Sequence, residues 1–198
     1  MGHRPTIACI VIAQERRRDL LDEHVLPSVI GQGFDEVVVV GQYHAGPGYR
    51  YLHVPPVVGT TLDALIKRDT GAVATTADLL VYLCDDHRLH SNFLADLHTA
   101  CSDAMWGTWD CLSPSRVTFR DGEEIPLNMG KADGYIGGHG LVIKRTALNV
   151  LPWMAGRHSR IWDKDISEQQ AHLGLRLAYA PQGWLAIVDI EPGAVPWL

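Results

Sequence analysis

The sequence predicts an α/β protein whose mainly parallel, twisted sheet is covered by helices on both faces. Two patterns predict this fold class. Short runs of β-branched and other apolar residues recur along the chain, and amphipathic segments of helical length separate them. Strands that are apolar on both faces are typical of a parallel sheet buried between two helical layers. With 198 residues, the chain has the length of one medium-sized domain, and we expect a single domain over residues 1–198.

In the first half of the chain, each expected strand is a short apolar run. These runs cover residues 6–13, 36–41, 49–54 and 79–83. Apolar residues at helical spacing predict helices over residues 17–30, 60–76 and 91–104. Pro27 predicts a kink or a break in the first of these helices, and Ser91 is a candidate N-cap for the last.

The second half of the chain is less regular. Its expected elements, in order, are strands in "WDCLSPS" and "GLVIKR", a short helix over 165–174 and strands over 175–181 and 183–190. Residues 120–140 are polar and rich in glycine, which predicts a long functional loop. Gly174 is expected to end the short helix.

Composition narrows the class of protein. The net charge of −6 argues against a broad basic surface for nucleic acid. No apolar run approaches the roughly 18 residues of a membrane span, and the N-terminal sequence lacks the pattern of a signal peptide. The four cysteines are scattered, as expected for reduced thiols. We therefore expect a soluble, cytoplasmic protein with no membrane partner.

Acidic residues follow the most apolar strand candidate, in the stretch "DLLVYLCDDHRLHSNFL". Asp85, Asp86 and His87 stand at its end, where open α/β sheets bind their ligands. Carboxylates and an imidazole suit Mg²⁺ or Mn²⁺, either of which can neutralise a diphosphate. Three alternatives stay open: a plain turn with a helix cap, a zinc site at Cys84, His87 and His90, and a small buried role for Cys84.

This stretch resembles the metal-binding segment of family 2-type nucleotide-sugar glycosyltransferases with the GT-A fold. In that family a strand ends in Asp-x-Asp or Asp-x-His, and a Leu-x-x-x-Phe-Leu helix start follows. Two registers fit. If Cys84 takes the first acidic position, Asp86 is the main metal ligand; otherwise Asp85 and His87 are the ligands.

Three further stretches extend the resemblance: "TIACIVIAQERR", "LPSVIGQGFDEVVVVGQ" and "LIKRDTGAVATTADLLVYL", the last with Arg68, Asp69 and Gly71 in the matching places. The resemblance, together with the element "GYIGGHGLVIKRTAL", implies donor-binding roles for Ala13, Gln14, Glu15, Arg16, Gln42, Arg68, Asp85, Gly137 and Gly138. Arg17 and Arg18 are, like Arg16, candidates for contact with phosphate.

"RIWDKDISEQQAHLGLRLAYAP" is similar to the acidic element that holds the general base of this family. The resemblance implies Asp165 as the base, with Asp163 sharing or supporting the role, since a carboxylate can take the proton of an attacking hydroxyl. Trp162 is a candidate to stack on the acceptor sugar, and His139 to contact the donor or the acceptor. An N-cap role for Asp165 and structural roles for Trp162 and His139 stay open.

The implied function is metal-dependent, inverting transfer of a sugar from a nucleoside-diphosphate sugar, with a UDP-sugar favoured, to a hydroxyl acceptor. Residues 1–104 would bind donor and metal, and residues 105–198 the acceptor. The acceptor class stays open between a small molecule, a protein, a glycan and modified DNA. The alternatives are a sugar-phosphate nucleotidyltransferase, which the glycine-free stretch "AQERRRDLL" disfavours, and a non-catalytic nucleotide-sugar-binding domain.

Overall fold

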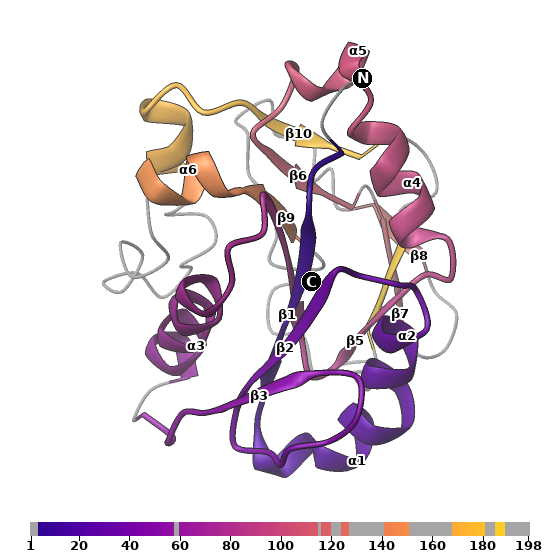
Figure 1. Cartoon of the computed structure of the whole chain (residues 1–198), viewed down its shortest axis with the longest axis vertical. Coiled ribbons are helices and arrows are strands. Elements are labelled where there is room, and N and C mark those ends of the chain that lie inside the picture. Colours follow the sequence, from indigo (N-terminus) through magenta and orange to yellow (C-terminus); the bar gives the residue numbers. More distant parts are fainter. Residues whose placement is uncertain are drawn as a thin grey trace.

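A seven-stranded sheet forms the centre of the molecule (Figure 1). The computed structural model describes residues 4–57, 60–114, 116–119, 124–126, 141–150, 168–180 and 185–188. The strand order is β10-β6-β9-β4-β1-β2-β3. The strands are β1 (Ile7–Ala13), β2 (Glu36–Gly41), β3 (Arg50–His53), β4 (Leu79–Cys84), β6 (Cys111–Ser113), β9 (Leu141–Lys144) and β10 (Leu177–Tyr179). Only β9 runs antiparallel to its neighbours, so the expected mainly parallel sheet is confirmed.

Helices cover both faces of this sheet, as the sequence predicts. They are η1 (Glu15–Arg17), α1 (Arg18–Leu20), η2 (Leu21–Val25), α2 (Leu26–Ile30), α3 (Thr60–Ala74), α4 (Phe93–Ala100), α5 (Asp103–Trp106) and α6 (Arg145–Val150). Figure 1 shows α3 and α6 on one side of the sheet and α1, α2 and α4 on the other. No helix in the described part of the chain is long and apolar enough to cross a membrane.

The strand β1 joins the two halves of the core. All of its residues are buried, and alternate side chains point to opposite faces. Cys9 packs with the η2, α2 and α4 layer, whereas Ile10 packs with α3 and α6. Gly71 lets α3 approach closely, because a Cβ atom there would lie 2.4 Å from Ile10 Cγ2. The distance between helix and strand is therefore set by a residue without a side chain.

Two predicted helix features have different outcomes. At Pro27, where the sequence predicts a kink or a break, the chain stays helical: the π-helical turn η2 directly precedes α2, and Pro27 lies in the first turn of α2. A π turn shifts the carbonyl groups that a proline ring would otherwise meet. The cap predicted at Ser91 is wrong, because α4 begins at Phe93 and Asn92 occupies the N-cap position. The expected helix over 91–104 is divided into α4 and α5.

A second sheet, which the sequence did not predict, lies beside the first. Its order is β5-β11-β7-β8, with β5 (His87–Leu89), β7 (Arg116–Phe119), β8 (Glu124–Pro126) and β11 (Leu185–Val188). The expectation of a loop over residues 120–140 is corrected by β8. Strands of three residues are too short to show a period in the sequence. β5 begins at His87, one of the metal ligands that the sequence analysis names.

The remaining predicted elements are found close to their expected bounds. The short helix near the C-terminal end covers residues 168–172, and Gly174 follows it with a positive φ of 78°, as expected for a helix-ending glycine. Among the described strands, β3 forms one end of the large sheet, beside β2.

Candidate functional site

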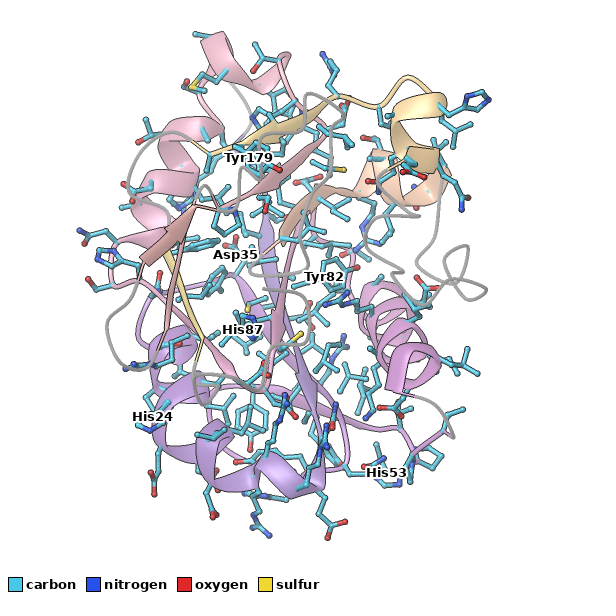
Figure 2. The ribbon with its side chains drawn as sticks, turned by 180° about the vertical axis from the view of Figure 1, so that it is seen from behind. His24, Asp35, His53, Tyr82, His87 and Tyr179 are labelled. Carbon is cyan, nitrogen blue, oxygen red and sulfur yellow. The ribbon has the colours of Figure 1, made fainter. Side chains whose placement is uncertain are left out.

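Asp85 and Asp86 form the turn between β4 and β5, at the carboxyl end of β4. Both carboxylates are buried, with 1% and 4% of their residue surface exposed, and His87 is 3% exposed. Figure 2 shows His87 in the interior of the molecule. A buried carboxylate is costly unless it is paired or binds a cation. These two buried carboxylates therefore need partners inside the protein or a bound cation.

Asp85 is held by the segment that follows β1. Its Oδ2 accepts the backbone N–H of Gln14 at 2.9 Å, and its Oδ1 accepts Arg17 Nη1 at 2.9 Å. Burial and the neighbouring charge of Asp86 raise the pKa of Asp85 to about 6, although Arg17 and the Gln14 N–H act in the opposite direction. These bonds attach the loop after β1 to the acidic turn.

Asp86 has a different set of contacts on each oxygen. Its Oδ2 accepts Arg17 Nη1, and its Oδ1 contacts His87 Nδ1. The Arg17 guanidinium therefore bridges the two aspartates. Arg16, which the sequence analysis named as donor-binding, is exposed and donates from Nε to Gln14 Oε1 at 2.8 Å. Of the three consecutive arginines, the structure brings Arg17 to the acidic turn.

Three potential ligand atoms come together around Asp86. One atom each from Cys84, Asp86 and His87 lie within 4.8 Å of one another. His90, considered with Cys84 and His87 as a zinc ligand, is not in this group, and its Nδ1 accepts the Asn92 N–H. A sulfur, an oxygen and a nitrogen donor at this spacing fit a divalent transition-metal cation. Asp85 lies outside the group, although the sequence analysis included it among the ligands.

The sulfur of Cys84 is influenced by Arg68 of α3. Arg68 is buried, and its Nη2 lies 3.4 Å from Cys84 Sγ. Burial raises the pKa of the Cys84 thiol to about 11, and the positive charge of Arg68 opposes this effect. Arg68, one of the predicted donor-binding residues, is therefore next to the acidic turn. All four cysteines are free thiols, as predicted.

The sequence analysis missed Lys67, which holds the end of β1. Lys67 is fully buried, and its Nζ donates to Ala13 O at 3.0 Å and to Asp63 Oδ2 at 2.5 Å. Asp63 Oδ1 in turn accepts the Val57 N–H at 3.1 Å. The signal in the sequence is an Asp and a Lys four residues apart on a helix, which usually indicates an exposed pair. Here the pair is internal and fixes the residue before Gln14.

The other predicted site residues are less informative. Glu15 is exposed, and Gln42, directly after β2, donates from Nε2 to Val54 O at 3.2 Å. The predicted residues that lie outside the described part of the chain are Gly137, Gly138, His139, Trp162, Asp163 and Asp165. Their assigned roles stay predictions.

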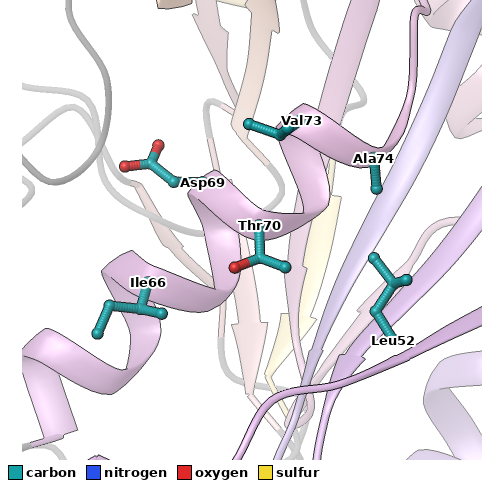
Figure 3. Close-up of a pocket in the computed structure, with 6 residues that line it drawn as sticks. All are labelled: Leu52, Ile66, Asp69, Thr70, Val73 and Ala74. Atoms are coloured by element: carbon teal, nitrogen blue, oxygen red, sulfur yellow. The ribbon is translucent and has the colours of Figure 1, made fainter.

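A separate hollow of about 510 Å³ lies between α3 and β3 (Figure 3). It is lined by Leu52, Ile66, Asp69, Thr70, Val73 and Ala74. None of residues 84–87 contributes to it, so it is distinct from the acidic turn.

Comparison with known proteins gives matches in structure only. No family model matches the chain, and neither does any curated protein sequence. The mannosyltransferase PcManGT from Pyrobaculum calidifontis, in complex with GDP-Man and Mn²⁺, aligns with a TM-score of 0.66 and 16% identity, over 97% of this chain and 59% of that chain. TarS from S. aureus aligns with a TM-score of 0.70 and 13% identity, over 94% of this chain and 37% of TarS.

A third similar structure is GalNAc-T7 with UDP, GalNAc and Mn²⁺, with a TM-score of 0.67 and 14% identity over 96% of this chain and 45% of that chain. At such low sequence identities, these structural similarities establish the fold alone. The chain has the GT-A-type α/β fold, as the resemblance in its sequence implies. It spans between 37% and 59% of the length of these three proteins.

Proposed function

We propose that this chain transfers a sugar from a nucleoside-diphosphate sugar to a hydroxyl acceptor. The observation that carries the proposal is the buried acidic turn at the carboxyl end of β4, bonded to the loop after β1 through Gln14 and Arg17. In open α/β sheets, ligands bind outside the carboxyl ends of the strands. The GT-A-type fold supports this, because the similar structures include one with GDP-Man and Mn²⁺ and one with UDP and Mn²⁺.

The donor would bind beside the acidic turn. Ala13, Gln14, Glu15, Arg16 and Gln42 would contact the nucleoside, with a UDP-sugar favoured. Arg17 is already charged and close to both aspartates, so its guanidinium can donate charge-assisted hydrogen bonds to a diphosphate. Arg68 adds a second positive charge next to the turn. Gly137 and Gly138 would line the sugar pocket.

A divalent cation, Mn²⁺ or Mg²⁺, would bind at Asp86 and His87, with Asp85 in support. The cation supplies positive charge that stabilises the leaving nucleoside diphosphate. The protein contributes a fixed, buried set of ligands: Asp86 is held by Arg17, and Asp85 by Gln14 and Arg17. Such preorganised charge lowers the barrier without rearrangement during the reaction.

The acceptor would bind to the half of the chain that covers residues 105–198. Asp165 would take the proton of the attacking hydroxyl, assisted by Asp163, and the sugar would be transferred with inversion. Trp162 and His139 would contact the acceptor. The acceptor class is open between small molecules, proteins, glycans and modified DNA.

The test is incubation of the chain with a panel of nucleotide sugars and Mn²⁺, with and without candidate acceptors. Release of nucleoside diphosphate and mass-spectrometric detection of the product are the two measurements. Asp86→Asn should reduce turnover by about 100-fold or more, as expected when a group that stabilises developing charge is removed. Asp19→Asn, a change at an exposed aspartate on α1, is the matched control and should leave turnover unchanged.

Two outcomes would contradict the proposed sugar transfer and favour another function instead. Release of pyrophosphate from a nucleoside triphosphate and a sugar phosphate would identify a nucleotidyltransferase. Metal-dependent binding of a nucleotide sugar without hydrolysis or transfer, over the whole acceptor panel, would identify a binding domain. Asp165→Asn separates the chemical steps, because it should leave donor affinity intact and abolish transfer.

A further inference from the structure

The candidate metal site at the acidic turn includes a sulfur atom. Cys84 is the last residue of β4, and its ligand atom lies with those of Asp86 and His87 inside a cluster 4.8 Å across. Arg17 occupies Asp86 Oδ2, whereas Asp86 Oδ1 lies beside His87 Nδ1. The carboxylate is therefore oriented so that one oxygen faces the guanidinium and the other faces the imidazole.

We propose that Cys84 is a thiolate ligand of this site, and that the site consequently binds Zn²⁺ or Co²⁺ more tightly than Mn²⁺ or Mg²⁺. Thiolate and imidazole are ligands for transition metals, whereas Mg²⁺ requires oxygen ligands at strict octahedral positions. The inference rests on the metal site of the proposed function and replaces Mn²⁺ or Mg²⁺ there by a transition-metal cation that favours a thiolate. Its geometric basis does not depend on transfer activity.

The surroundings of Cys84 suit a bound thiolate. Arg68 Nη2 lies 3.4 Å from the sulfur and can donate to it, as groups around a metal site commonly do to the ligands. The alternation along β4 places Tyr82 and Cys84 on the same face, which α3 covers, and Arg68 belongs to α3. The two guanidinium groups, of Arg17 and Arg68, also balance part of the negative charge that a thiolate and two aspartates would bring.

Titration of the wild-type chain with Co²⁺ tests the inference without any sugar nucleotide. A thiolate bound to Co²⁺ produces an intense near-ultraviolet charge-transfer band, which oxygen and nitrogen ligands do not produce. We expect this band in the wild type and its loss in Cys84→Ser. The matched control is Cys101→Ser, which removes a half-buried thiol just after α4 and should keep the band. Zn²⁺ should displace Co²⁺ at stoichiometric amounts, whereas an excess of about 100-fold Mg²⁺ should not.

A measurement on the unmodified chain covers the case in which Cys84→Ser does not fold. Zinc X-ray absorption should show one sulfur neighbour at about 2.3 Å, together with nitrogen and oxygen neighbours. A site with no sulfur neighbour, a wild type without the cobalt band, or a band that persists in Cys84→Ser would overturn the inference. If these results support the thiolate but no transfer occurs with any donor, the proposed function fails while the inference on Cys84 stands.

Discussion

Replacing Lys67 with methionine tests the internal ion pair that anchors the end of β1. The methionine side chain retains most of the volume of lysine, so the change removes the charge and leaves little cavity. Lys67 has 1% of its side chain exposed and Asp63 has 10%, so solvent offers little compensation for the lost partner. Breaking a buried pair in this way costs about 3–5 kcal/mol.

The hydrogen bonds that remain after Lys67→Met decide where in the range of about 3–5 kcal/mol the loss of stability lies. Asp63 keeps the N–H of Val57 at 3.1 Å, whereas Ala13 O loses the ammonium group that donates to it. We expect a loss of about 3 kcal/mol in the free energy of unfolding, which is a large part of the total of about 5–15 kcal/mol for a typical domain. The double variant Lys67→Met/Asp63→Asn leaves no unpaired charge and should lose only about 1–2 kcal/mol.

Urea unfolding followed by tryptophan fluorescence measures this difference, since the slope with urea should be the same for all variants. Nucleotide affinity, measured by calorimetry at a temperature where all variants are folded, should fall in both, because Ala13 directly precedes Gln14. The reasoning is refuted if Lys67→Met loses less than about 1 kcal/mol, or if the double variant is as unstable as the single one.

The remaining predictions concern packing, pH and charge. Gly71→Ala should destabilise the chain by about 1–3 kcal/mol in the same urea assay, because the new methyl group would meet Ile10 Cγ2; an unchanged midpoint would show that α3 can shift freely. The hydrogen bonds from Arg176 lower the pKa of Asp110, so this carboxylate stabilises the fold above its unfolded-state pKa of about 3.9 and loses that effect as pH falls through the folded-state value. Asp110→Asn should therefore flatten the loss of stability as the pH falls below about 4, and an unchanged acid slope would contradict this. Arg17→Gln removes the group that holds both aspartates of the acidic turn and should weaken Co²⁺ binding by about 10-fold, measured by competition with a chelator; tighter binding would mean that the arginine repels the cation more than it orients the ligands.

The parallel part of the fold was predictable because its strands are long and apolar on both faces. β1, β2 and β4 are found within one residue or so of their expected bounds, and the helical layers follow the expected alternation. The second sheet was not predictable in this way. β5 (His87–Leu89) has three residues and lies in the middle of the chain, whereas its partner β11 (Leu185–Val188) lies near the C-terminal end. The pairing of His87 with Val188 therefore has no local signal in the sequence.

The candidate site was predictable in position but not in its contacts. The acidic residues follow a strand, which indicates the carboxyl end of a sheet, and the structure puts them there. The choice between Arg16 and Arg17 depends on the turn of η1, which orients only one of them toward Asp85. The contact of Arg68 with Cys84 depends on how close α3 packs to the sheet, which no single segment of sequence encodes.

The strand β3, at the end of the large sheet, bears on how the molecule behaves at high concentration. An open strand edge can recruit other extended chains and so start aggregation. Arg50 of β3 forms an ion pair with Glu36 at 2.9 Å, and the prolines at positions 55 and 56 follow the strand closely. Pairing of another chain with this edge would take the charged side chains of Arg50 and Glu36 out of water, which is unfavourable. Proline has no backbone N–H to donate to an incoming strand. Among the described strands, these features are expected to limit the pairing of β3 with another chain.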